Sequence, residues 1–212
     1  MINLINLNLE YSKRPVIVRV ITLVFTFVMF SLVVPVSANQ LGDFQRVETE
    51  TLDEQDFVFP DDFQGESLNV VMLAISKEQD NGTWQGDMLV EWYAALNDAG
   101  VLSDQVLGYH FSVMKVPFFV KGFIRGAIAE SYEGKLPLNQ AGVIFYKKLD
   151  EFARAPGIAL DGQPTLVLVA SDGELLEVFK GEATPENIEA VSAAVATYLQ
   201  PVTDSAAPDQ TD

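Results

Sequence analysis

Residues 162–170, which read GQPTLVLVA, decide the fold. A proline stands just before an apolar, β-branched run, and the turn-forming SDGE of residues 171–174 separates that run from a second one at 175–179 (LLEVF). Two strand-like runs around an Asp-Gly turn predict a β-hairpin. Because proline has no N–H to donate to a neighbouring strand, Pro164 is expected at the first position of the first strand.

The neighbouring segments predict helices and strands in an alternating order. After the hairpin, Thr184-Pro185 favours the start of a final helix, over residues 185–199. Upstream, residues 68–75 (LNVVMLAI) and 106–114 (VLGYHFSVM) are typical of buried strands, and a helix opening at Gly86 is expected between them. This order indicates a βαβ unit.

Two more helices are predicted between this unit and Pro164. In the first, over residues 118–131, the spacing predicts an inward face and an outward pair. The inward residues are Phe119, Phe123, Ile124 and Ile128, and the outward pair is Lys121 and Arg125. The second is expected over residues 141–154, with apolar positions again three and four residues apart.

The first 38 residues predict an export signal. Lys13, Arg14 and Arg19 precede an apolar run at 20–34, and Pro-Val-Ser-Ala follows at 35–38. A basic segment, an apolar segment and small residues before a cut are typical of a signal peptide, so cleavage after Ala38 and a periplasmic or secreted protein are expected. Left uncleaved, the segment would tether the protein to a membrane.

The sequence therefore predicts four parts. These are a signal peptide (1–38), an acidic N-terminal arm (39–66), a folded domain (67–200) and a disordered acidic tail (201–212). The arm could add one edge strand at residues 57–59. Its acidic residues match no calcium loop, so no metal site is predicted there.

Charge and composition exclude several functions. Without the first 38 residues, which hold three bases and one acid, 10 Lys and Arg stand against 29 Asp and Glu, a formal charge of −19. That charge argues against nucleic acid and against docking of the whole protein on anionic lipid, so membrane contact is expected only through an uncleaved N-terminus. With no cysteine and a single histidine, thiol redox chemistry, Cys-ligated zinc and a His-rich metal site are excluded, and no cofactor is expected.

The element order resembles the thioredoxin-like superfamily, most closely over residues 157–199. The resemblance implies a three-layer α/β/α fold with a central mixed sheet and a helical insert. In that superfamily a cis proline opens the corresponding strand, so the resemblance also implies a cis Gln163–Pro164 bond. The organisation is similar to that of the exported, cysteine-free YtfJ-type branch.

The departure from the superfamily shapes the functional prediction. Redox members carry Cys-x-x-Cys where this chain has SKEQDNGTWQG at residues 76–86, so no catalytic residue is carried over. The role of the superfamily proline includes binding an extended substrate backbone. The resemblance therefore implies a binding groove, for which we predict the residues Ser76, Thr83, Trp84, Gln163, Pro164 and Thr165.

Other residues allow two interpretations each. Trp84 could face this groove or pack on the core. His110 could serve as a general base, although a hydrogen-bonded structural histidine within a strand is favoured. Six of the ten bases lie between residues 115 and 148 and could form a basic patch for an acidic partner, although ordinary solvated helix faces are favoured. For the Phe118-Phe119 pair, core packing is expected.

The leading functional hypothesis is a non-redox binding or accessory module that holds a periplasmic protein or peptide beside Pro164. One alternative is an enzyme without thiol chemistry, in which Ser76, Thr83 or Tyr109 helps to bind a thiol cosubstrate such as glutathione. The other is a membrane-tethered structural subunit.

Overall fold

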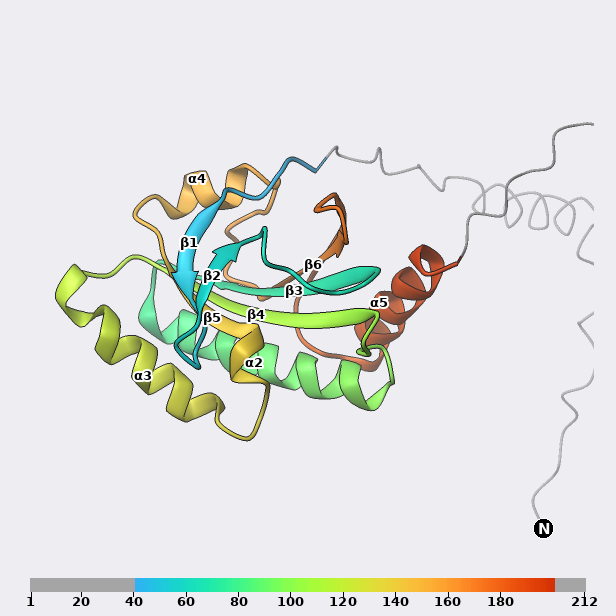
Figure 1. Ribbon diagram of the computed structural model, residues 1–212, viewed down its shortest axis with the longest axis horizontal. Helices are drawn as coiled ribbons and strands as arrows, with labels where there is room; N and C mark the ends of the chain where they lie inside the picture. Colours follow the sequence, from blue (N-terminus) through green and yellow to red (C-terminus); the bar gives the residue numbers. More distant parts are fainter. Residues whose placement is uncertain (1–40, 201–212) are drawn as a thin grey trace, which may run out of the picture. The chain divides into compact units, whose positions relative to one another are not determined.

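The computed structural model of this protein describes residues 41–200. The predicted signal peptide and the predicted tail lie outside these residues. The centre of the fold is a five-stranded sheet in the order β5-β4-β3-β6-β7 (Figure 1). The three strands β3, β4 and β5 are parallel, and β6 and β7 run antiparallel to their neighbours. The strands are β3 (Leu68–Ile75), β4 (Val106–Met114), β5 (Ala141–Phe145), β6 (Thr165–Ala170) and β7 (Leu175–Lys180).

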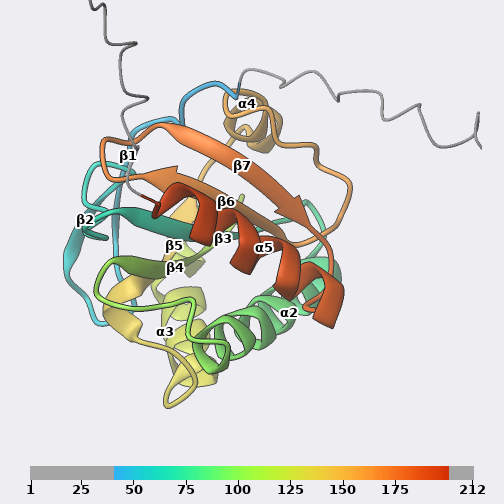
Figure 2. The same ribbon diagram turned by 90° about the vertical axis from the view of Figure 1, so that its right-hand side faces the viewer.

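Helices cover both faces of the sheet, as predicted for a three-layer fold. One face carries α2 (Gln79–Asp98), α3 (Lys121–Tyr132) and α5 (Pro185–Tyr198), and α2 and α5 lie side by side on it (Figure 2). The other face carries α4 (Leu149–Arg154). Alternate residues of the central strands point to the two faces, as the pleat of a strand requires. Val71 and Leu73 belong to the α4 side, whereas Val70 and Met72 pack under α2 and α5. The apolar clusters of the described residues lie between Leu41 and Leu199, so this body has a core of its own.

The predicted acidic arm is instead a folded hairpin. β1 (Val47–Glu50) and β2 (Asp56–Phe59) pair antiparallel in a sheet of their own. Buried Phe57 and Phe59 pack on Phe111 of the central sheet, with ring centroids 5.4 and 5.2 Å apart respectively. The isolated aromatic residues of this segment are therefore part of the core, and residues 57–59 add no edge strand to the central sheet.

The last third of the predicted fold is confirmed almost residue for residue, including the hairpin and the final helix. Thr184 caps α5 by accepting a hydrogen bond from the Asn187 amide at 3.3 Å. The upstream strands β3 and β4 also have their predicted bounds.

Helix α2 begins seven residues earlier than predicted, at Gln79 rather than Gly86. The sequence Asn81-Gly82 favours a turn, but the Gly82 amide donates to the Glu78 carbonyl at 2.9 Å, as in a helix. Tertiary hydrogen bonds made by Asn81 and Gln85 hold this first part of the helix, and they outweigh the weak local preference.

The predicted helix over residues 141–154 is wrong in its first half. Residues 141–145 form β5, parallel to β4, and only residues 149–154 form a helix. A short apolar run fits either element by periodicity alone. The strand is possible because Gly142 leaves room for the Phe111 ring, which would lie 2.7 Å from a Cβ at that position.

Helix α3 was predicted at the right place, and its predicted inner face is half right: Ile128 packs against the core and Ile124 is half-buried. Phe118 and Phe119 of the preceding 3-10 turn (Phe118–Val120) and Phe123 of α3 are exposed rather than packed. Lys121 and Arg125 are half-buried instead, and the Arg125 guanidinium pairs with Glu50. The periodicity is compatible with a helix that turns either the phenylalanines or Lys121 and Arg125 towards the sheet. The ion pair between Arg125 and Glu50 of β1 forms only in the second orientation, which is the one observed.

Candidate functional site

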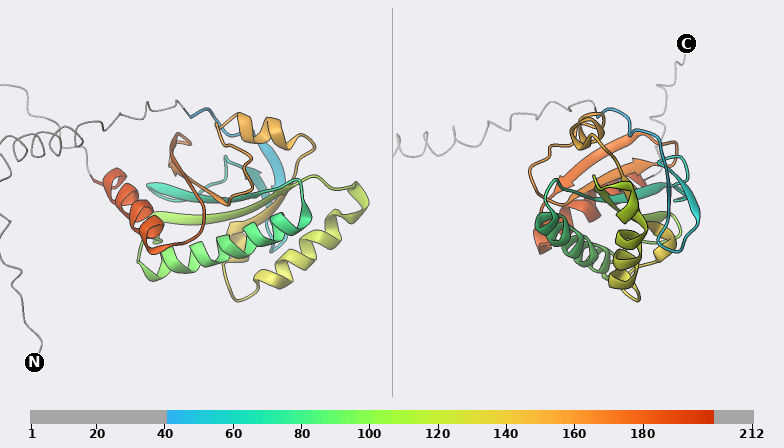
Figure 3. Two further views of the ribbon diagram at one scale, coloured as in Figure 1. Left: turned by 180° about the vertical axis from the view of Figure 1, so that it is seen from behind. Right: turned by 90° about the vertical axis from the view of Figure 1, so that its left-hand side faces the viewer.

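Four segments that are distant in sequence meet at one end of the central sheet. The parallel strands β3, β4 and β5 all finish there, at Ile75, Met114 and Phe145. The antiparallel strand β6 begins there, because its first residue, Thr165, pairs with Leu73. We call this the strand-end face, and Figure 3 (right) shows the molecule from the side on which α3 begins. In open α/β sheets ligands bind beyond the carboxyl ends of parallel strands.

The predicted residues on the β3 side are engaged within the chain. Ser76 Oγ donates to the Glu78 carbonyl at 2.8 Å and accepts from the Glu78 amide at 3.1 Å, which forms a turn just before α2. Thr83 Oγ1 donates to the carbonyl of Gln79 one turn earlier, at 3.1 Å. Trp84 lies in the second turn of α2 and is half-buried. Of these three side chains only that of Thr83 is exposed.

The predicted residues on the β6 side are mostly covered. Pro164 and Thr165 are buried, and Gln163 is exposed. Both main-chain groups of Gln163 have partners, since its N–H donates to Asp161 Oδ1 at 3.2 Å and its carbonyl accepts from Thr165 Oγ1 at 3.4 Å. A peptide that paired with this backbone would have to displace both.

The implied cis Gln163–Pro164 bond is wrong, because the cis peptide among residues 41–200 joins Phe59 to Pro60. The trans form of an X–Pro bond is favoured by about 0.5–1 kcal/mol in the absence of other constraints. No pattern in the sequence singles out Phe59–Pro60 from other X–Pro bonds.

A hydrogen-bond network that the sequence did not reveal joins these two sides. Asn81 Nδ2 donates to the Gly162 carbonyl at 2.9 Å, and Gln85 Nε2 donates to Asn81 Oδ1 at 2.7 Å. Gln85 is fully buried and also bonds the backbone of Ile75, accepting from its amide at 3.0 Å and donating to its carbonyl at 3.2 Å. The start of α2, the end of β3 and the loop before Pro164 are thereby held together.

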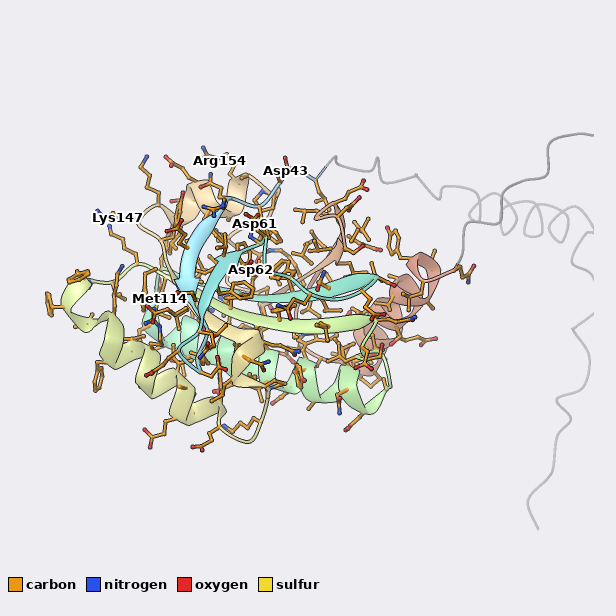
Figure 4. The ribbon with its side chains drawn as sticks, viewed as in Figure 1. Asp43, Asp61, Asp62, Met114, Lys147 and Arg154 are labelled. Atoms are coloured by element: carbon orange, nitrogen blue, oxygen red, sulfur yellow. The ribbon has the colours of Figure 1, made fainter. Side chains whose placement is uncertain are left out.

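A cavity of about 250 Å³ lies at the ends of β4 and β5. Its lining consists of three lysines, three aromatic residues and a valine, namely Lys115, Val116, Phe118, Lys121, Phe145, Tyr146 and Lys147. Lys115 and Lys147 are exposed, and Figure 4 shows Lys147 on the side of the molecule where α3 begins. We call this cavity the lysine pocket.

The lysines of the pocket carry uncompensated charge. Within residues 41–200, neither Lys115, Lys121 nor Lys147 forms an ion pair, whereas nearby Lys77 and Lys148 pair with Asp150 and Glu151. Lys121 Nζ lies 5.8 Å from the Phe118 ring centroid and 5.1 Å from that of Phe145. Cations at such distances are attracted to aromatic faces, so Lys121 is held between two walls of the pocket.

A second cavity, of about 330 Å³, lies between α4 and the segment that follows it. Its charged lining residues are Asp150, which is paired with Lys77, and Arg154. The lining of this cavity therefore carries no excess of positive or negative charge.

His110 lies in the interior, away from both cavities. Neither ring nitrogen has a hydrogen-bond partner, and the ring meets Tyr132 edge to face with centroids 4.8 Å apart. Burial lowers the pKa of His110 to about 4, because the charged ring is excluded from water. The buried position agrees with a structural histidine and leaves no access for a substrate, but the ring lacks the hydrogen bond expected of one.

Two further observations concern metal binding and membrane spans within residues 41–200. No group of three or more His, Cys, Asp or Glu side chains is arranged to hold a metal ion. No helix in this part of the chain combines the length and apolar character needed to cross a bilayer.

Comparisons with known proteins support the fold. No protein-family model and no curated protein matches the chain. Yeast Sco1 is similar in structure, at 12% identity over 78% of this chain and 100% of that chain, with a TM-score of 0.53. The copper-bound form of yeast Sco1 is 10% identical over 82% of this chain and 99% of that chain, with a TM-score of 0.50. A SCO1/SenC family lipoprotein from Bacillus anthracis is 11% identical over 75% of this chain and 96% of that chain, with a TM-score of 0.49.

The two similarities to yeast Sco1, with TM-scores of 0.53 and 0.50, show the fold alone. The chain has a thioredoxin-like fold, as its sequence predicted, and it has no cysteine. The resemblance to the YtfJ-type branch stays a prediction.

Proposed function

We propose that this protein is an exported, non-redox binding module that holds an anionic group, a phosphate or a carboxylate, in the lysine pocket. Export is inferred from the basic and apolar N-terminal sequence, and the absence of thiol chemistry follows from the lack of cysteine. The fold supplies a rigid sheet end, and the pocket supplies the charge. Binding, rather than catalysis, is proposed for this site.

One observation carries the proposal. Three lysines with no ion-pair partner among residues 41–200 line one small cavity, in a protein whose acids outnumber its bases by 30 to 13. Gathered like charges repel one another, and an anion placed among them relieves that repulsion and gains charge-assisted hydrogen bonds. The aromatic walls supply an apolar lining, as is usual in ligand pockets.

The groove predicted beside Pro164 has less support. Pro164 is buried, and the main-chain groups of Gln163 that an extended peptide would use are bonded internally. The hydroxyls proposed for a glutathione site are engaged as well, since Tyr109 Oη accepts from the Gln64 amide at 3.0 Å and Ser76 caps its own turn. The tethered alternative depends on residues outside the described part of the chain.

Inorganic phosphate, pyrophosphate and citrate are suitable probes. In ¹H–¹⁵N spectra recorded at constant ionic strength, we expect saturable shifts at the amides of Lys115, Lys121 and Lys147. The double variant Lys115→Ala/Lys147→Ala should weaken binding at least tenfold, whereas Lys135→Ala, an exposed lysine outside the pocket, should not. Absence of saturable shifts with all three anions would contradict the proposal.

A further inference from the structure

We infer that the strand-end face docks on a bilayer containing anionic phospholipid. Phe118, Phe119 and Phe123 insert among the lipids, and the lysine pocket receives a phosphate headgroup. This inference rests on the proposed function, because it uses the same pocket and names the source of its anion.

The three phenylalanines form an exposed aromatic tip. Their exposed fractions are 86%, 84% and 81%, whereas Tyr198 on α5, the other large exposed apolar side chain among residues 41–200, reaches 43%. Large exposed aromatic side chains gathered in one short segment mark an interaction surface, since water is a poor solvent for them. The three rings leave the pocket wall at Phe118 and continue onto α3.

The outer face of α3 extends this apolar tip. Gly122 and Gly126 lie on the exposed side with Phe123, and a Cβ built on either glycine would meet nothing within 4 Å. Ala127 is exposed on the same side. Up to Ala127 the helix thus presents small and aromatic residues outward and keeps Arg125 inward, where it pairs with Glu50, and an acidic residue, Glu130, is exposed only in the last turn.

The charge around the tip is opposite to that of the protein. Residues 106–129 contain no Asp or Glu, although the chain has 30 acidic residues. The bases beside the tip are Lys115, Lys121 and Lys147. At physiological salt, charges more than about 8 Å apart are largely screened, so a surface touching this face meets the lysines and not the acidic body.

This combination fits a bilayer better than a second copy or a folded partner. The aromatic residues project, so a protein partner would need a matching apolar recess. The larger cavity described above has an apolar lining of Ala153, Gly157, Ile158, Ala159 and Leu160, but its two charged residues, Asp150 and Arg154, have opposite signs and give it no acidic excess to receive the three lysines beside the tip. A membrane interface accepts aromatic rings without a preformed pocket, and anionic headgroups attract adjacent lysines.

Vesicle co-sedimentation of the chain from Asn39 to Asp212, which contains the complete described body, tests the inference. We expect binding to mixed phosphatidylcholine–phosphatidylglycerol vesicles and much weaker binding to pure phosphatidylcholine vesicles. Each of Lys115→Ala and Lys147→Ala should lower the partition coefficient about fivefold. Each phenylalanine replaced by serine should lower it roughly tenfold.

Matched controls exist on the same molecule. Tyr198→Ser removes an exposed aromatic from α5 at the other end of the molecule (Figure 1), and Lys135→Ala removes a lysine outside the pocket. Both should bind like the parent chain. Because the three phenylalanines and both lysines are exposed, circular dichroism should show every variant folded.

The outcomes separate the two proposals. Saturable anion binding without vesicle binding would overturn the membrane inference and leave the proposed function standing. Equal binding to both vesicle types, or vesicle binding indifferent to the phenylalanines, would also overturn the inference. Self-association that depends on Phe119 in the absence of vesicle binding would assign the tip to a second copy instead.

Discussion

Asn81 Nδ2 donates to the carbonyl of Gly162 across 81 positions of sequence, at 2.9 Å. In this fold the bond joins the first turns of α2 to the loop that leads into Pro164. Asn81 Oδ1 accepts from buried Gln85 at the same time, so the asparagine satisfies a donor and an acceptor together. We call this pair of hydrogen bonds the Asn81 clasp.

Removing the clasp should destabilise the protein. In Asn81→Ala, Gln85 Nε2 loses one acceptor and Gly162 loses its donor, so we expect a loss of about 1–3 kcal/mol in the free energy of unfolding. Urea denaturation measures it. Thr83→Ala, an exposed site two residues away with only a local bond, should change stability by less than about 0.5 kcal/mol. Equal losses in the two variants would show that the clasp contributes nothing special.

His110 should make the fold acid-sensitive. Its pKa is about 4 in the folded protein and 6.5 when unfolded, so the unfolded chain binds the proton more strongly. Stability is therefore lost as pH falls from about 6.5 towards 4, and the 2.5-unit difference limits the loss to about 3 kcal/mol. In His110→Phe, which preserves a ring against Tyr132, this part of the pH dependence should vanish. If plots of the free energy of unfolding against pH stay parallel for the two proteins from pH 7 to 4, His110 is not the source of the acid sensitivity.

Alanine substitutions at two glycines should change the stability of the protein in opposite directions. At Gly142, a Cβ would lie 2.7 Å from the Phe111 ring and 3.1 Å from the Glu50 carbonyl, so Gly142→Ala should cost about 1–3 kcal/mol by overpacking. At Gly126, in the exposed part of α3, nothing lies within 4 Å, so Gly126→Ala should stabilise by up to about 1 kcal/mol. Thermal unfolding distinguishes the signs. A stable Gly142→Ala protein would mean that β5 is not packed against β4 as described.

The surface pair Lys77–Asp150 should affect titration and not stability. The hydrogen bond from Lys77, at 2.8 Å, holds the pKa of Asp150 below its ordinary value of 3.8. In Lys77→Ala that pKa should rise towards 3.8, as followed by carboxyl ¹³C NMR, while the unfolding midpoint stays unchanged because both side chains are solvated. An unaltered Asp150 titration would show that the pair does not persist in solution.

Much of the fold could be predicted because local signals agree with the tertiary structure. The apolar run of β3, the Asp-Gly turn between β6 and β7 and the Thr-Pro start of α5 each have one good solution. Two of the errors fall where a segment has two good solutions. Residues 141–145 fit a strand or a helix, and α3 fits the sheet in either of two rotations.

The candidate site was harder to predict, because its residues are brought together by topology. For the six bases between 115 and 148 the sequence favours ordinary solvated helix faces over a basic patch. The three that share a pocket follow β4 and β5 or begin α3. The exposure of Phe118 and Phe119 contradicts the usual burial of such residues, and no local pattern announces it.

By itself, the sequence determined the positions of the buried strands β3 and β4, the final hairpin and helix, the strong negative charge and the absence of thiol chemistry. These follow from composition and short-range periodicity, which need no partner segment. Only the tertiary structure decided that Asn81 binds Gly162, that Arg125 turns inward to Glu50 and that three lysines share one cavity. Each of these depends on which strand ends lie together, and parallel pairing across crossover connections sets that at long range.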